Sequence, residues 1–366
     1  MKSSSPGRGF LGDAGLRMPE TGRSIEGGNL VDYKMMIKAG LIGAALTLTG
    51  GIAFAQDSVA PGYYDALKGK KVGFVPISMG FDLTQVWLAG MQRQANELGY
   101  EIIVRDPNWS VESGIQAITS LIEEVPDLLI IQNNDNQSYN RLVQQAAAAG
   151  IPVIQVQQSV ETKSDAYIGP DWFNIGTVTA QALVDKCGAG TSGKIAVVEG
   201  ATAAPAPILM KAGIEALVAK HPEVSIVSSQ AADWDASKAF AITATVLQQN
   251  PDLCGIAGFW DVADTGTADA IREAGLEGKV VLATSGGGSR DAGCAKVTSG
   301  EFSVYQSYKV AGQARDLNSA IKMLLQAKLP AGSAPFALLS PLVQVTKDNM
   351  TPSSCWTLDE IAKTGG

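Results

Sequence analysis

Short apolar segments alternate with longer stretches of helical periodicity from Lys71 onward, and this alternation restricts the fold more than any other feature of the sequence. Strands are predicted at 71–75, 101–105, 128–132 and 152–156, and helices at 84–98, 111–123 and 138–149. Continuous apolar strands that alternate with helices are typical of a parallel sheet covered on both faces. This part of the chain therefore predicts one α/β domain.

A second series with the same rhythm follows, without recognisable repetition of the sequence itself. Its strands are predicted at 194–198, 224–228, 254–259, 279–283 and 302–306, with helices between them. The chain has 366 residues, which suits about two domains. We therefore expect two doubly wound parallel-sheet domains. Ligands of such sheets bind at the carboxyl ends of the strands, so two facing domains create a cleft that contacts a solute from both sides.

The segment before the first strand has the order of a secretory signal. Lys34 and Lys38 form a basic region, an apolar run covers 39–48, and Ala53-Phe54-Ala55 is a cleavage sequence. The run is short for a membrane span. A buried helix is the alternative interpretation, but the four glycines between positions 40 and 51 disfavour it. We expect export to the periplasm, with cleavage near Ala55.

Residues 1–55 are accordingly assigned to an N-terminal extension and signal peptide, and the true start to Met35 or Met36. The extension before these methionines is rich in glycine, serine and arginine and has no periodicity. Because no cysteine follows the apolar run, a lipid anchor is not expected.

Composition and charge exclude several classes of partner. The formal net charge is −8 and the pI is near 4.9, so neither nucleic acid nor an anionic membrane surface is an expected partner. The single histidine, His221, precedes Pro222 at a predicted helix end, which indicates a surface position. Triads and metal sites that depend on histidine are thereby excluded. We expect no catalytic residue, no metal, no cofactor and no enzymatic activity.

Two glycine-rich segments resemble phosphate-binding loops. Residues 188–194 end in Gly-Lys, but Ile195 stands where a P-loop carries Ser or Thr, and the segment runs from a helix into a strand, the reverse of the required order. It is interpreted as a helix stop and turn. Gly286-Gly287-Gly288 follows a strand and either places backbone amides at the cleft or forms a simple turn.

The four cysteines, Cys187, Cys254, Cys294 and Cys355, all lie in the part expected to be exported, where disulfides persist. Three pairings are possible. The pair Cys254–Cys294 is favoured, since both belong to the second strand–helix series, and buried free thiols are the alternative. None of the cysteines has the spacing of a zinc site.

Aromatic residues flanked by carboxylates are the strongest candidate binding signal. Trp234 lies between Asp233 and Asp235 after a strand, and Trp260-Asp261 stands at the end of another strand. Sugars and polyols offer C–H faces to an aromatic plane and hydroxyls to carboxylates and amides, so indole beside aspartate suits them. The alternative is that each Trp packs in the core and each Asp caps a helix.

Further polar groups follow the strands of the first series: Ser78, Phe81 and Asp82 after the first strand, Asn134 and Asp135 after the third, and Gln157 and Gln158 after the fourth. Amides and short polar groups thus gather at strand ends with few cations. This composition favours neutral hydroxylated ligands over phosphates and carboxylates.

The assembled sequence resembles the ribose- and galactose-type periplasmic sugar-binding proteins across essentially the whole mature chain. The resemblance is carried by Gly99-Tyr100 and by residues 149–154, 168–171, 233–235 and 345–349. It implies the type I periplasmic binding fold, with two Rossmann-like domains joined by three crossovers, a monomer that closes around its ligand, and delivery to an inner-membrane ABC permease.

The resemblance also implies that both domains are discontinuous. The first ligand-binding lobe is predicted to comprise 69–170 plus 307–339, and the second 171–306 plus 340–364. Crossovers are placed near Pro170-Asp171, Gln306-Ser307 and 339–341.

Carried over residue by residue, the family pattern assigns Trp234 to stacking on the sugar, Gln306 to an amide contact near the hinge, Phe81 to the first-lobe aromatic segment, and Asp171 to a family motif. The departures are equally informative. Gln157-Gln158 stands in place of an Asp-Arg pair, 205–209 in place of an arginine, Trp260-Asp261 in place of Asn-Asp, and Ser285 in place of an aspartate. These changes disfavour ribose and glucose, and favour a less polar or open-chain solute such as a sugar alcohol.

The expected function is that of the solute-binding component of an ABC importer, which captures a small neutral sugar or sugar alcohol by domain closure. The alternative is a periplasmic sensor that serves a chemoreceptor or a sensor kinase. An enzyme lacks motif support, and a transcription repressor of similar core fold requires a helix-turn-helix segment where this chain has its signal sequence. The sequence leaves the identity of the ligand open.

Overall fold

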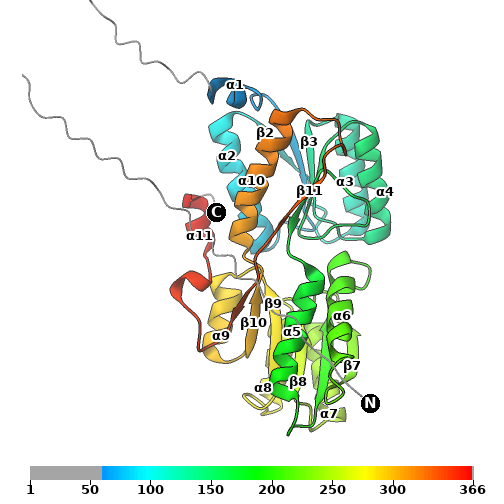
Figure 1. Ribbon diagram of the computed structural model, residues 1–366, viewed down its shortest axis with the longest axis vertical. Helices are drawn as coiled ribbons and strands as arrows, with labels where there is room; N and C mark the ends of the chain where they lie inside the picture. Colours follow the sequence, from blue (N-terminus) through cyan, green and yellow to red (C-terminus); the bar gives the residue numbers. More distant parts are fainter. Residues whose placement is uncertain (1–59, 365–366) are drawn as a thin grey trace, which may run out of the picture. The chain divides into compact units, whose positions relative to one another are not determined.

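Two six-stranded sheets, each covered by helices, form the structure, a computed structural model that describes residues 60–364 (Figure 1). These residues belong to one compact unit of the chain, Ala55–Gly366. The predicted signal peptide and N-terminal extension lie outside the described residues. Within the described part, no helix is both long enough and apolar enough to cross a membrane.

The first lobe is built on a sheet of order β11-β5-β4-β3-β1-β2, in which every pairing is parallel. Its elements are α1 (Ala60–Asp65), β1 (Lys71–Val75), α2 (Asp82–Leu98), β2 (Glu101–Val104), α3 (Val111–Glu124), β3 (Leu128–Ile131), α4 (Asn136–Ala148), β4 (Val153–Val156), β5 (Ala166–Gly169), α10 (Val310–Ala327) and β11 (Phe336–Leu339).

The second lobe is built on a sheet of order β12-β10-β9-β8-β6-β7, parallel except for β12, which is antiparallel to β10. Its elements are α5 (Trp172–Cys187), β6 (Lys194–Glu199), α6 (Pro205–Val218), β7 (Ser225–Ala231), α7 (Ala236–Gln249), β8 (Gly255–Gly258), α8 (Asp264–Glu273), β9 (Val281–Gly286), the π-helix η1 (Arg290–Cys294), α9 (Ala295–Ser299), β10 (Val304–Ser307), β12 (Val343–Val345) and the 3₁₀ helix η2 (Pro352–Ser354).

The strands predicted from the sequence overlap those found, and the predicted fold class is confirmed. Every residue of β3, β4 and β8 is buried, as expected for central strands covered on both faces. The edge strand β7 instead alternates between exposed and partly buried residues. The two sheets have matching orders, so β1 and β2 of the first lobe occupy the places of β6 and β7 in the second.

Within residues 60–364, three connections pass between the two sheets. The chain crosses from β5 to α5, returns from β10 to α10, and crosses again from β11 to β12. In Figure 1, α10 lies along α2, and the two helices pack against each other. Both lobes therefore combine segments that are far apart in the sequence.

The last helix, α11 (Leu358–Thr364), packs against α2 of the first lobe. Residues 340–364 are predicted from the sequence to belong to the second lobe; β12 does so, whereas α11 lies against the first lobe. Ile361 is buried, and the Arg93 guanidinium donates to the carbonyl of Lys363. The apolar side of α11 is covered by α2, which explains why the chain returns to the first lobe at its end.

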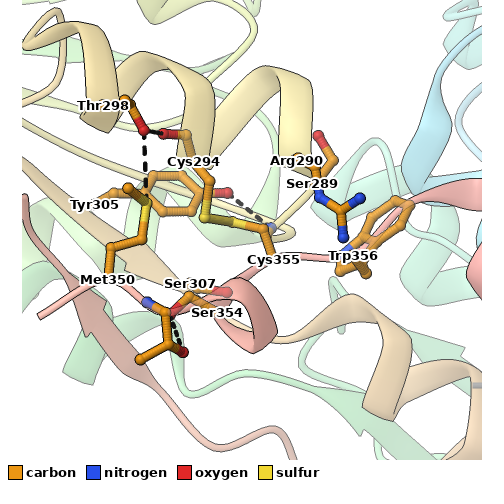
Figure 2. Close-up of a disulfide and its surroundings, with 12 residues drawn as sticks. Ser289, Arg290, Cys294, Thr298, Tyr305, Ser307, Met350, Ser354, Cys355 and Trp356 are labelled. Carbon is orange, nitrogen blue, oxygen red and sulfur yellow. Dashed lines mark hydrogen bonds between the residues drawn. A yellow bond between two sulfur atoms is a disulfide. The ribbon is translucent and has the colours of Figure 1, made fainter.

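The cysteine pairing favoured from the sequence is wrong. The disulfides are Cys187–Cys254 and Cys294–Cys355. Cys254 precedes β8 at the amino edge of the second sheet, whereas Cys294 follows β9 beyond the carboxyl edge, so these two residues lie at opposite edges of parallel strands. Figure 2 shows Cys355 bonded to Cys294, with Arg290 and Trp356 nearby.

Candidate ligand-binding site

A cavity lies between the two lobes, and clefts between domains are a preferred place for small-molecule sites. We call it the interlobe cavity. Seven aromatic residues, three aliphatic residues and three glutamines line it: Phe81, Trp109, Trp172, Trp234, Phe259, Trp260, Tyr308, Ile77, Leu83, Ala206, Gln132, Gln157 and Gln158. Nearly all of them follow the carboxyl ends of strands, where α/β sheets bind ligands.

Four of the aromatic side chains contact one another across the interlobe cavity and form what we call the aromatic box: Phe81, Trp109, Trp234 and Trp260. Phe81 stacks on Trp109 with ring centroids 5.2 Å apart, and its ring meets that of Trp260 edge-on at 5.6 Å. The centroid of the Trp260 ring lies 6.1 Å from those of Trp109 and Trp234. These distances are favourable for aromatic pairs. Since Phe81 and Trp109 belong to the first lobe and the other two to the second, the aromatic box joins the lobes.

Trp109 and Trp234 occupy equivalent turns in the two lobes. Trp109 follows β2 and Trp234 follows β7, and in each turn the tryptophan and the residue before it have positive φ. The φ of Trp109 is 70° and that of Trp234 is 66°, a left-handed conformation that is rare for bulky residues and clusters at ligand sites. In each turn the next residue, Ser110 or Asp235, accepts a backbone N–H and caps the following helix.

Trp234 packs directly on the backbone of Gly200, which follows β6. A Cβ atom added to Gly200 would lie 2.2 Å from Cη2 of the indole ring. Glycine is therefore required at this position for the ring to lie where it does. The indole Nε1 of Trp234 is buried and has no hydrogen-bond partner among the described residues.

The three glutamines differ in what they already bind. The side-chain oxygen of Gln132 accepts the backbone N–H of Ile77 at 3.0 Å, and that of Gln158 accepts the backbone N–H of Ala206, in the other lobe, at 3.2 Å. Gln157 is held by its backbone, because its carbonyl accepts from both the Tyr167 hydroxyl and the Trp172 indole. Its own Oε1 is buried without a partner among residues 60–364.

Buried carboxyl groups lie behind the aromatic wall of the second lobe. Asp261 accepts from the Tyr305 hydroxyl at 2.7 Å, and burial raises its pKa to about 7, with the charge of Asp82 adding to the shift. Asp264 accepts the backbone N–H of Trp260 at 3.1 Å and is bonded by the hydroxyl of Thr284. Burial raises the pKa of Asp264 to about 7 as well. These groups position Trp260 and do not line the interlobe cavity.

The structure brings five of the residues predicted from the sequence to the interlobe cavity, namely Phe81, Gln157, Gln158, Trp234 and Trp260. The others take supporting positions around it. Asp82 lies at the start of α2, close enough to Asp261 to affect its pKa. Ser78 accepts the backbone N–H of Gly80, the Asn134 amide donates to the Trp109 carbonyl at 3.1 Å, and the Ser285 hydroxyl donates to the Phe259 carbonyl.

Three further predicted residues make local contacts outside the cavity lining. Asp135 caps α4 and Asp171 caps α5, each by accepting a backbone N–H three residues later, and Asp171 is exposed. Gln306 donates to the side chain of Gln344 at 3.0 Å, which connects β10 to β12. Helix capping and strand pairing account for these contacts.

Trp109, Trp172 and Tyr308 line the cavity but are not among the binding residues predicted from the sequence. Trp172 and Tyr308 follow two of the interlobe connections and meet edge-on with ring centroids 5.4 Å apart. The signal for Trp109 is present in the sequence, since Asn108-Trp109-Ser110 has the same plan as Asp233-Trp234-Asp235. A search for tryptophan beside a carboxylate does not find it.

A family model described as a periplasmic binding protein domain matches residues 72–329. The chain belongs to this family of periplasmic binding proteins. The resemblance to sugar-binding proteins seen in the sequence is thereby confirmed.

Curated relatives of this periplasmic binding protein carry the names of sugar and sugar-alcohol binding proteins. A ribose import binding protein of Bacillus subtilis is 26% identical over 204 residues, which cover 56% of this chain and 65% of that protein. A xylitol-binding protein of Mycolicibacterium smegmatis is 25% identical over 266 residues, which cover 72% of each chain. The match to the Bacillus protein thus spans a little less than two thirds of its length.

Solved structures share the fold. An ABC transporter periplasmic solute binding protein from Actinobacillus succinogenes with bound D-allose superimposes with a TM-score of 0.66 at 24% identity, covering 81% of this chain and 99% of that one. A carbohydrate transporter solute binding protein from Agrobacterium radiobacter, in complex with D-arabinose, gives a TM-score of 0.70 at 18% identity, covering 78% and 97%. At these identities the likeness establishes the fold.

Proposed function

We propose that this chain is the non-catalytic, monomeric solute-binding component of an ABC importer, and that it captures a small neutral sugar or sugar alcohol in the interlobe cavity. The observation that carries the proposal is the composition of the cavity wall. Aromatic rings and amides line it, and among the described residues no Lys, Arg, Asp or Glu side chain does so.

Aromatic faces and amides are chemically suited to such a ligand. Aromatic planes pack against the C–H faces of sugars and polyols, and amides exchange hydrogen bonds with hydroxyls. A phosphate or a carboxylate ligand calls for charge-assisted hydrogen bonds from Lys or Arg, and the cavity wall offers none. The xylitol-binding and ribose import relatives support the same ligand class.

Domain closure is supported by direct hydrogen bonds between the lobes. Besides the bond from Ala206 to Gln158, the backbone N–H of Asn136 donates to the carbonyl of Ala203 at 3.1 Å. The first of these bonds joins two residues of the cavity wall, and both bonds break when the lobes separate. Export by the predicted signal peptide would bring the protein to the periplasm, where an inner-membrane permease would bind its closed, ligand-bound form.

Thermal unfolding of the purified protein against aldoses, deoxysugars, polyols and sugar phosphates tests the proposal. A ligand present at about 100 times its Kd stabilises a protein by about 2.7 kcal/mol, so a neutral sugar or polyol should raise the Tm by several degrees. Quenching or shift of tryptophan fluorescence serves as a second readout, because four of the six tryptophans line the cavity. A stabilising response to sugar phosphates alone would contradict the proposal.

A further inference from the structure

The wall of the interlobe cavity offers few hydrogen-bond acceptors for a site that receives a sugar. Among the thirteen lining residues, the three glutamines and Tyr308 are the ones that carry a side-chain oxygen. Two of the glutamine oxygens already accept backbone N–H groups. The Trp172 indole is likewise engaged by the carbonyl of Gln157. Half of the side-chain acceptor oxygens of the wall are therefore already used by the protein itself, and few remain for the O–H groups of a ligand.

Two buried polar atoms at the interlobe cavity remain without a partner among the described residues, Oε1 of Gln157 and Nε1 of Trp234. One is an acceptor and the other a donor, so together they match one or two hydroxyl groups of a ligand. Gln157 is only 2% exposed and has positive φ. A buried group held in this way marks a position where a ligand completes the hydrogen bonding.

The rest of the wall consists of the aromatic box and its apolar neighbours. These side chains pack favourably against C–H groups but offer no hydrogen-bond acceptor to a hydroxyl. A hydroxyl that enters an apolar site without a partner lowers affinity by about tenfold to a hundredfold. An aromatic plane gains from each C–H or methyl group that it covers. A ligand with hydroxyls on every carbon therefore leaves several of them unpaired here, whereas a ligand that lacks one or two leaves fewer.

We propose that the interlobe cavity selects hydroxyl-poor ligands, namely deoxygenated or O-methylated small sugars, over their fully hydroxylated counterparts. The proposal rests on the proposed function and narrows its ligand class. Gln157 and Trp234 bind the hydroxyls that remain, and the aromatic box covers the deoxygenated or methylated face.

Matched ligand pairs that differ by one hydroxyl test this selection. Titration calorimetry with D-fucose against D-galactose, and with 2-deoxy-D-ribose against D-ribose, should give at least about tenfold tighter binding of the deoxy member in each pair that binds. Equal or tighter binding of the fully hydroxylated members overturns the selection but leaves the proposed function standing. Binding of no sugar or polyol at all overturns both.

Serine substitutions of two alanines distinguish hydrogen bonding by the cavity wall from general effects on the fold. Ala206→Ser adds one hydroxyl to the cavity wall and should narrow the deoxy-to-hydroxy affinity ratio several-fold. Ala219, the residue after α6, is exposed and outside the cavity lining, so Ala219→Ser should leave the ratio unchanged. If Ala206→Ser also leaves it unchanged, hydrogen bonding by the wall does not set the preference.

A variant of Gln157 distinguishes a ligand contact from a structural role. Gln157→Leu removes the unpaired acceptor, and removal of a buried group without a partner leaves stability unchanged or raises it. We expect affinity for the preferred sugar to fall by about tenfold or more, with no fall in the Tm of the free protein. Unchanged affinity, or unfolding of the free variant, would contradict the assigned role.

Discussion

The turns that carry Trp109 and Trp234 use the same backbone plan in the two lobes, yet they hold their rings differently. The Trp234 ring lies on Gly200 of its own lobe and is partly buried. Trp109 is 40% exposed, stacks on Phe81 of its own lobe, and touches Trp260 of the other. Trp234 is thus fixed before the lobes meet, whereas part of the packing of Trp109 forms only when they close. One wall of the interlobe cavity is preformed and the other is completed by closure.

The largest effect is expected from Gly200→Ala, which breaks the preformed wall. The added methyl group would overlap the Trp234 ring, and overpacking of this kind costs about 1–3 kcal/mol of unfolding free energy. The displaced ring should also weaken sugar binding about tenfold or more. Denaturant unfolding and calorimetric titration measure the two effects. Gly312→Ala is the control, because only a flexible arginine side chain approaches that position, at 3.7 Å, and stability should not fall.

Alanine substitution of Trp234 and of Trp109 tests directly whether the first belongs to a preformed wall and the second to a wall completed by closure. Trp234→Ala should weaken ligand binding by about 1–1.5 kcal/mol with little loss of stability. Trp109→Ala should cost less, about 0.5–1 kcal/mol, because its partly exposed ring contributes less buried area. Phe173→Ala, an exposed aromatic on α5 outside the cavity lining, serves as the control for both. Unfolding of the Trp234 variant would support a core-packing role for this residue instead. A larger loss of ligand affinity for Trp109→Ala than for Trp234→Ala would reverse the assignment of the preformed wall and the wall completed by closure.

The two sides of the interlobe cavity also differ in their titratable groups, because two buried carboxyl groups lie behind the second-lobe wall. The stability of the protein should therefore depend on pH through the second lobe. The pKa of Asp261 and that of Asp264 are each raised to about 7 by burial, above the ordinary value of 3.8. The folded protein binds these protons more tightly than the unfolded chain, so the free energy of unfolding falls as pH rises from about 4 to about 7. Asp261→Asn should reduce this slope by up to about 1.4 kcal/mol per pH unit. Denaturant unfolding at a series of pH values measures it, and an unaltered slope would rule out titration of Asp261 in this range.

The smallest effect is expected when glycine replaces the residue before the tryptophan in each of the two turns that carry Trp109 and Trp234. Asn108 and Asp233 both have positive φ, which glycine adopts without strain but with a greater loss of entropy on folding. These terms oppose each other, so Asn108→Gly and Asp233→Gly should change the free energy of unfolding by no more than about 0.5 kcal/mol. Asn108→Val, which cannot adopt this conformation readily, should destabilise clearly more. Equal behaviour of the valine and glycine variants would show that the turn does not enforce the left-handed backbone.

The sequence predicted the repeated architecture well because it depends on periodicity, which is a local property. Strands such as β3 and β4 are continuous apolar runs, and their neighbours in the sheet follow from the parallel rule. It predicted the position of Trp234 for the same reason, since a turn after a strand is also local. The disulfide pairing failed because it depends on which edge of the sheet each cysteine reaches. Membership of the cavity wall failed for Tyr308 and Trp172 because it depends on how the interlobe connections bring the lobes together.

The return of α11 to the first lobe has a consequence for biogenesis. The first lobe needs α10 and β11 to complete its sheet and its helical cover, and α2 receives its last covering helix only from the final residues of the chain. The second lobe needs β12 and the first lobe needs α11, so neither can finish folding until these segments have emerged. For a chain that is threaded through a membrane before it folds, as proposed here, this order of assembly delays compact structure until transport is nearly complete and keeps the chain competent for translocation.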